Sequence, residues 1–460
     1  MKFYRLGVIL IAAVWLSCSD SPTPPDDTDA KTSEDSTSDV STEDSTEPGE
    51  DVTDPQEDVT DPQEDVTETG DETTDPEEVE EPDPGVPCVD DFCAAGPDSA
   101  PDPSRPGPFP VGIKTAIYTD YEHPNIDDET PRILKTEIWY PTTEEFRNAD
   151  RYAYDPKADG TDDLREKYAD IDLGIFPCDG VYDAPVLRNH GKFPLLIFSH
   201  GAFGIRYQSV YHTIHMASHG YIVAAPDHQY NTLYEIMVRG WSGTELPASA
   251  MARPRDIEFL INVFTERNAD PDDELYNLID LDNIAVTGHS FGGLTAYLAL
   301  FDKRVKAIVP MAPEGTMIDL LSSAFSGPKV YEIDTPTLMM GGRLDRTLRY
   351  KESMADIFEQ QGPPKWFLTV NRGGHYTFTD MCRMNLEELQ ERWGDAKDAL
   401  KDGCDPENNW DYREAQKAIN LYTAAFLNTF IRHSPGSAQW LTPEAGAEFG
   451  DEIEFVAAPE

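Results

Sequence analysis

One short stretch, Gly288-His289-Ser290-Phe291-Gly292, constrains the fold and the chemistry of this chain more than any other. It follows an apolar run at 283–287 that is typical of a buried strand, and it precedes a helix-like run at 294–300. The glycines on either side of Ser290 allow the strand and the helix to approach each other closely, so the serine occupies a sharp turn. In this context the pattern G-x-S-x-G predicts that Ser290 is a nucleophile.

Strand-like and helix-like segments alternate through residues 106–460, which we expect to form the folded domain. Such alternation predicts an α/β fold with a mostly parallel central sheet and helices on both faces. Insertions within this pattern are expected to form a cap over the sheet and to shape a pocket. The expected strands are 111–118, 133–140, 193–199, 221–226, 283–287, 307–311, 337–340 and 366–370; the helices are 206–219, 253–267, 294–300, 349–360 and 411–432; the insertions are 142–191, 229–250, 314–334 and 377–410.

A serine hydroxyl needs a base, and the base needs a carboxylate to orient it. After an elbow of this kind the partners follow in the order serine, acid, histidine. Two histidines follow Ser290, namely His375 and His433. His375 follows the strand 366–370 through a short loop, at the carboxyl end of the sheet where α/β sites are built. His433 stands at the end of the last helix, which favours a solvated role, so we expect His375 to be the base.

Two carboxylates compete for the role of orienting acid. Asp345 closes a loop after the second strand beyond the elbow, and Glu314 follows the first. Asp345 has two glycines before it and arginines beside it, which suits a polar loop that holds an ionised side chain. Glu314 follows a proline and leads into an apolar segment that reads as a cap helix. We expect Asp345 to be the acid, with Glu314 as the alternative.

An oxyanion hole needs two main-chain N–H groups. The N–H of Phe291 lies at a helix N-terminus, and the stretch His200-Gly201-Ala202-Phe203 after a strand makes the N–H of Ala202 the best second donor. His200 is expected to be structural, and His289 needs no role. The nearby charged residues Arg253, Arg255 and Asp256 are expected to form helix–loop ion pairs.

Several sequence segments around these residues resemble a known family. The segments FSHGAFG (198–204), ASHGYIVAAPDH (217–228), GHSFGG (288–293) and GGHYTFTD (373–380) closely resemble the plasma-type platelet-activating factor acetylhydrolases. The Asp345 loop is more similar to dienelactone-hydrolase and polyester-hydrolase relatives, because in the acetylhydrolases proper the acid follows the earlier strand. The resemblance covers 106–435 and implies an α/β-hydrolase fold with a calcium-independent serine esterase activity on short acyl esters, including lipid esters. It implies no cofactor and no metal ion.

The N-terminus predicts export. Lys2 and Arg5 precede an apolar run at 6–16 that is too short to span a bilayer and is typical of a signal peptide. The run ends at Ser17-Cys18, which resembles a bacterial lipoprotein signal whose cysteine is lipidated, although Trp15 stands where that pattern usually has leucine. An ordinary secretory signal is the alternative. We therefore expect a signal peptide at 1–18, with Cys18 anchoring the chain to a membrane of the cell envelope.

Residues 19–105 are rich in acidic residues, Ser, Thr and Pro, and Asp51–Glu57 repeats at 58–64. Such a segment cannot bury enough apolar surface to fold, so we expect a disordered acidic tether. The whole chain carries a net charge of −51, which argues against nucleic acid as a partner. Export permits disulfides. Cys88 with Cys93, and Cys382 with Cys404, are possible pairs that leave Cys178 over, but spacing does not fix the pairing.

The sequence thus predicts an exported, lipid-anchored serine ester hydrolase that uses Ser290, His375 and Asp345 to act on short-acyl esters, acetylated phospholipids among them. Two alternatives remain open at this stage. One is an amidase or peptidase of the same fold, and the other is a surface-displayed binding protein without catalytic activity.

Overall fold

The computed structural model describes residues 101–125, 128–240, 245–385, 388 and 401–460. The predicted signal segment, Cys18, Cys88 and Cys93 lie outside the described residues, as does nearly all of the predicted tether. Within the described part of the chain, no helix is both long enough and apolar enough to cross a membrane.

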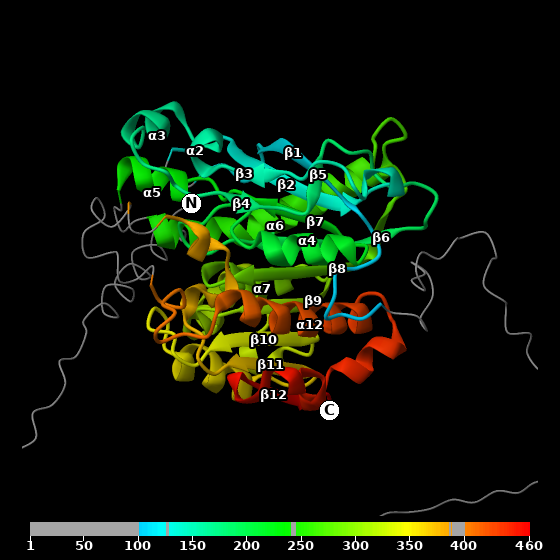
Figure 1. Ribbon diagram of the computed structural model, residues 1–460, viewed down its shortest axis with the longest axis vertical. Coiled ribbons are helices and arrows are strands. Elements are labelled where there is room, and N and C mark those ends of the chain that lie inside the picture. Colours follow the sequence, from blue (N-terminus) through cyan, green and yellow to red (C-terminus); the bar gives the residue numbers. More distant parts are fainter. Residues whose placement is uncertain (1–100, 126–127, 241–244, 386–387, 389–400) are drawn as a thin grey trace, which may run out of the picture. The chain divides into compact units, whose positions relative to one another are not determined.

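A sheet of ten strands runs through the middle of the described residues (Figure 1). Six neighbouring strands are parallel, and their largely buried, apolar side chains suit a sheet covered on both faces. In spatial order the strands are β12 (Ile453–Ala458), β11 (Lys365–Val370), β10 (Thr337–Gly342), β9 (Val305–Met311), β8 (Ile279–His289), β6 (Phe193–Ser199), β7 (Ile222–Pro226), β2 (Arg132–Pro141), β1 (Val111–Asp120) and β5 (Gly180–Tyr182).

Helices cover both faces of this sheet (Figure 1). On one face α4 (Val210–Ser218) packs against α12 (Tyr412–Phe430), and on the other α6 (Glu245–Ala269) packs against α7 (Phe291–Leu298). The central strand β6 is buried along its whole length between these layers. The predicted mostly parallel α/β fold is therefore confirmed.

The edges of the sheet differ from the expectation. The insertion at 142–191 is not only a cap, because it contributes β5, which pairs in parallel with β1. It also carries α2 (Pro156–Asp159), α3 (Asp162–Lys167) and a two-stranded ribbon of β3 (Ala153–Tyr154) and β4 (Phe176–Pro177), and α3 contacts α5 (Leu233–Arg239). At the other edge β12, which we did not expect, pairs antiparallel with β11. Both strands are short or follow irregular segments, so their periodicity is weak.

The remaining elements are short. The predicted helix at 349–360 is a π-helical turn at Lys351–Ala355 followed by α9 (Asp356–Gln360), and α8 (Ile318–Ser322) occupies the segment after β9. Short 3-10 turns lie at Glu144–Phe146, Ala299–Phe301, Gly315–Met317, Ser323–Phe325, Val330–Glu332, His375–Phe378, Met381–Arg383, Pro435–Trp440 and Pro443–Glu452. All the predicted site residues of this domain follow the carboxyl ends of parallel strands, which meet at one edge of the sheet.

Candidate active site

Ser290 stands at a strained turn between β8 and α7. Its backbone has φ 56° and ψ −115°, a left-handed conformation that costs free energy for any residue other than glycine. Two glycines make the turn possible. A Cβ at Gly292 would overlap the main-chain oxygen of Ser199, and a Cβ at Gly288 would overlap the main chain of Gly292. The turn is held by a 2.8 Å hydrogen bond from the N–H of Ser290 to the carbonyl of Met311.

His375 lies between Ser290 and Asp345. Its Nε2 is 2.9 Å from the Ser290 Oγ, and its Nδ1 is 2.8 Å from a carboxylate oxygen of Asp345. The three residues follow β8, β11 and β10, so strands far apart in the sequence bring them together. His375 is 3% exposed and Asp345 is 9% exposed, whereas Ser290 is half-buried and can meet a substrate. The Asp345 carboxylate also accepts from the N–H groups of Thr347 and Leu348.

Glu314 does not bond to His375 in this arrangement. Its carboxylate accepts hydrogen bonds from the N–H and hydroxyl of Thr316, at the start of the short turn after β9. Burial raises the pKa of Glu314. Burial acts to lower the pKa of His375, but the carboxylates of Asp345, Asp402 and Glu314 outweigh it and the net shift is upward.

The two residues that are expected to supply the oxyanion donors belong to segments next to Ser290. Phe291 begins α7, and the N-terminus of a helix favours an anion through its main-chain N–H groups and its dipole. Ala202 follows β6 in a tight turn in which Phe203 has a positive φ of 56°. A Cβ at Gly201 would lie 3.5 Å from the Cβ of Ser290, so this turn approaches the serine closely. In this arrangement the N–H groups of Ala202 and Phe291 can donate to the carbonyl oxygen of a substrate when Ser290 attacks the carbonyl carbon.

The sequence of this chain is similar to that of known proteins. A family model described as platelet-activating factor acetylhydrolase, isoform II, matches residues 103–237, and one described as PET hydrolase-like matches 208–394. The platelet-activating factor acetylhydrolase of the dog, Canis lupus familiaris, is 30% identical over 330 residues, which cover 60% of this chain and 68% of the relative. The chain belongs to the platelet-activating factor acetylhydrolase family. It is a carboxylic ester hydrolase.

Two further matches agree with the family. The platelet-activating factor acetylhydrolase of the guinea pig, Cavia porcellus, is 25% identical, and the match covers 74% of this chain and 80% of the relative. A solved structure of a ferulic acid esterase from Streptomyces cinnamoneus superposes with a TM-score of 0.54 at 23% identity, covering 76% of this chain and 96% of that one. This likeness supports the α/β-hydrolase fold alone.

The buried carboxylate of Asp402, which we did not predict, holds two loops of the candidate site together. One oxygen of Asp402 accepts hydrogen bonds from the N–H groups of Arg346 and Thr347, at 2.9 and 2.8 Å. The other oxygen accepts from the N–H of His375 at 3.2 Å, and the Asp402 carbonyl accepts from the N–H of Tyr376 at 2.7 Å. Asp402 therefore joins the loop of Asp345 to the loop of His375. It lies in the polar insertion at 377–410, which has no periodic pattern that would single out Asp402.

The loop that carries Asp402 is tied by a disulfide between Cys382 and Cys404. This is one of the two pairs that the sequence left possible. Cys178 is a free, buried thiol, and burial raises its pKa to about 12, so it is unreactive as a thiolate at neutral pH.

His289, to which we gave no role, connects two parts of the site. Its Nε2 bonds to the carbonyl of His375 at 2.9 Å, and its Nδ1 bonds to the side-chain amide of Gln208 at 2.9 Å. The oxygen of the same Gln208 amide accepts from the N–H of Gly201 at 3.1 Å. A relay of hydrogen bonds thus runs from the Ala202 turn to the loop of His375.

A second set of serine, histidine and aspartate residues is linked by hydrogen bonds in the protein interior. The Ser199 Oγ is 2.8 Å from His228 Nε2, and His228 Nδ1 is 2.7 Å from Asp256, which also pairs with Arg132. Ser199 and His228 are fully buried, so no substrate reaches them, and this set is structural. His200 belongs to the same set because its Nε2 accepts from the N–H of His228 at 3.0 Å, which agrees with its expected structural role.

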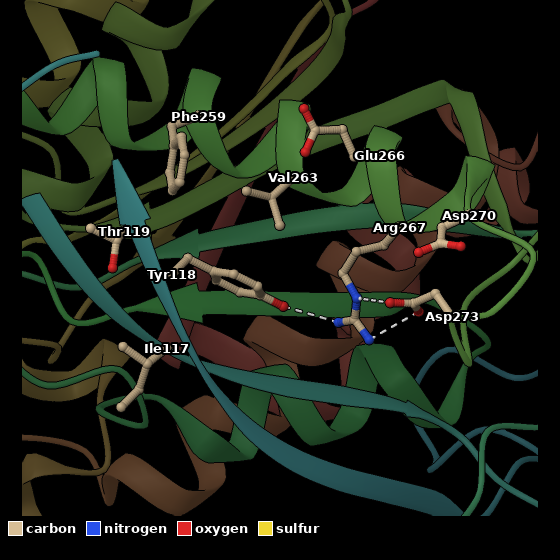
Figure 2. A pocket seen from close by; sticks show the side chains of 9 residues that line it. All are labelled: Ile117, Tyr118, Thr119, Phe259, Val263, Glu266, Arg267, Asp270 and Asp273. Atoms are coloured by element: carbon tan, nitrogen blue, oxygen red, sulfur yellow. Dashed lines mark hydrogen bonds and ion pairs between the residues drawn. The ribbon is translucent and has the colours of Figure 1, made fainter. Parts of the chain in front are cut away.

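A pocket of about 520 Å³ lies elsewhere, between β1 and α6 (Figure 2). It is lined in part by Ile117, Phe259 and Val263, and its Arg267 bonds to the Tyr118 hydroxyl and to Asp273. None of the predicted site residues lines it. Among the described residues, no group of three or more His, Cys, Asp and Glu is arranged to hold a metal ion.

Proposed function

We propose that this family member hydrolyses short-acyl carboxylic esters through Ser290, His375 and Asp345, by way of an acyl-enzyme. The observation that carries the proposal is the position of His375, which bonds through one nitrogen to the Ser290 hydroxyl and through the other to the Asp345 carboxylate. A base so held carries its proton on Nδ1 and leaves Nε2 free to accept the serine proton.

The proposed reaction has two halves. The Ser290 Oγ attacks the ester carbonyl carbon while its proton moves to His375 Nε2, and the N–H groups of Ala202 and Phe291 hold the oxyanion. The C–O bond to the leaving alcohol then breaks, and His375 returns the proton to that oxygen. Water attacks the acyl-enzyme in the same way, with His375 first taking and then giving a proton, which releases the acid and restores Ser290.

The family resemblance supports acetylated phospholipids as candidate substrates, because the relatives are named for an acetylhydrolase activity. A series of p-nitrophenyl esters from acetate to palmitate, measured beside an acetylated ether phospholipid, tests the substrate class. We expect kcat/KM to be highest for the short acyl chains and matched anilides to react more slowly. Faster turnover of the anilides would favour an amidase, and no turnover of any ester would contradict the proposal.

We also propose that the chain is exported and anchored through a lipid on Cys18, with 19–105 as the tether between the membrane and the catalytic domain. The support is the signal-like run that ends at Cys18 and the acidic composition that follows it. Such an anchor would place the enzyme at a membrane surface of the cell envelope, where lipid esters are available.

A further inference from the structure

Arg253, on α6, lies directly behind the proposed oxyanion hole. Its side chain is fully buried, yet it bonds mainly to neutral oxygens. One Nη donates to the carbonyl of His200, and the other donates to the carbonyl of Gly201 at 3.1 Å and to the side-chain oxygen of Asn231. The helix–loop ion pair that we expected for Arg253 is therefore replaced by contacts with the turn before Ala202.

Its charged neighbours are engaged elsewhere. Arg255 pairs with Glu258 one turn along the helix, and Asp256 pairs with Arg132. Burial lowers the pKa of Arg253, and the Asp256 carboxylate opposes that shift. An arginine starts from so high a pKa that it remains a cation at neutral pH. Burying a cation has a large desolvation cost. We therefore expect the position of Arg253 behind this turn to serve a function.

The Gly201 carbonyl is the most heavily bonded acceptor of the turn. It receives hydrogen bonds from Arg253, from the His200 Nδ1 at 2.7 Å and from the N–H of Gly204 at 3.1 Å. That carbonyl and the N–H of Ala202 belong to the same planar peptide group. Donors that pull electron density toward the oxygen make the N–H at the other end a stronger donor, because hydrogen bonds in a chain polarise one another.

Arg253 also contacts the second donor residue. Its guanidinium lies over the ring of Phe291, 4.7 Å from the ring centroid, as in a cation–π pair. One side chain therefore touches the residues that supply both proposed N–H groups, one through its peptide plane and one through its ring. Because the Arg253 side chain is fully buried, it makes these contacts without being open to a bound substrate.

We propose that Arg253 is a positioning residue of the oxyanion hole, which fixes the Gly201–Ala202 peptide and strengthens its N–H as a donor to the transition-state oxyanion. This inference rests on the proposed function. Arg253 acts through Ala202 and Phe291 and does not touch the substrate. Its effect should therefore fall on kcat, because the charge on the substrate oxygen develops only in the transition state.

The test uses the full chain with three single variants, Arg253→Met, Arg253→Lys and, as a matched control, Arg255→Met. We expect Arg253→Met to lower kcat for p-nitrophenyl acetate by about 10- to 100-fold with KM changed less than about threefold. The inhibition constant of an alkyl trifluoromethyl ketone, whose adduct with Ser290 carries an oxyanion, should rise by the same factor as kcat/KM falls. Arg255→Met should behave like the parent.

Arg253→Lys keeps the cation but not the planar fork that reaches both carbonyls. It should lower kcat by at least about threefold, and it provides the test if Arg253→Met does not fold. A folded Arg253→Met or Arg253→Lys variant with the parent's kcat would overturn the proposal, as would a loss that appears only in KM or an unchanged inhibition constant. Ester turnover by the parent, and its loss in Ser290→Ala, tests the proposed function separately from these outcomes.

Discussion

The Asp402 carboxylate accepts a 3.2 Å hydrogen bond from the main-chain N–H of His375, 27 residues earlier in the sequence. Its other oxygen holds the N–H groups of Arg346 and Thr347, immediately after Asp345. Asp402, which is not one of the proposed catalytic residues, therefore holds the loop of the acid Asp345 against the loop of the base His375. Because Asp402 also lies near the imidazole, it influences the protonation of His375.

Replacing Asp402 by Asn should move the pH profile. The negative charge of Asp402 contributes to the raised pKa of His375, so its removal lowers that pKa. His375 acts as a base only when neutral, and the acid limb of kcat/KM should consequently shift to lower pH. The amide has one acceptor oxygen instead of two, so kcat should also fall by about tenfold. Asp405→Asn, a change at a partly exposed position in the same loop, is the control, and an acid limb that stays in place or moves upward would contradict the assignment.

Asp345→Asn and Glu314→Gln separate the two candidate acids. Asp345→Asn should lower kcat by about three to four orders of magnitude, because it favours the wrong tautomer of His375. Glu314 caps Thr316 and does not bond to the imidazole, so Glu314→Gln should cost less than about tenfold. Both are measured at saturating ester, and the reverse ranking would assign the acid to Glu314.

Removal of the Cys382–Cys404 disulfide should affect stability and turnover together. The bond closes a loop of 22 residues in sequence, which corresponds to about 3 kcal/mol of unfolding free energy in the chain-entropy view. The double serine variant should have a lower Tm, and kcat should fall because Asp402 lies two residues before Cys404. A lower Tm with an unchanged kcat would show that the disulfide does not hold Asp402 in place.

The central strands, and the closeness of Ser290, Asp345 and His375, could be predicted from the sequence because both depend on the strand order around the elbow. The elbow fixes where one strand ends, and the carboxyl ends of parallel strands meet at one edge, so residues after β10 and β11 must lie near Ser290. The family that these motifs resemble is also the one to which the chain belongs. The edge strands β5 and β12 were missed because they are short or peripheral.

Residues that act at long range were also missed. Asp402 lies in a segment with no periodic pattern, and its partners are fixed only when the chain has folded. From the sequence we expected Arg253 to form an ion pair, like other charged residues on its helix. A sequence does not distinguish an arginine that pairs with a carboxylate from one that donates to two carbonyls. His289 likewise gains its contacts to Gln208 and His375 from the tertiary arrangement.

The proposed anchor is tested in the cell. Cys18 lies outside the described residues, and the expectation rests on the sequence alone. The mature protein should partition with membranes, and Cys18→Ser should release it or block its processing. If the Cys18→Ser protein is processed and membrane-bound like the parent, the lipid anchor is wrong and another element holds the chain.

The role of Ser290 as the nucleophile is tested by the Ser290→Ala variant, measured for ester turnover and for labelling by a fluorophosphonate probe. Loss of the nucleophile should lower kcat by about four or more orders of magnitude while the fold and Tm remain those of the parent. The parent should be labelled at Ser290 and the variant should not. A folded Ser290→Ala protein that retains tens of per cent of the parent's turnover, or that is labelled like the parent, would show that Ser290 is not the nucleophile.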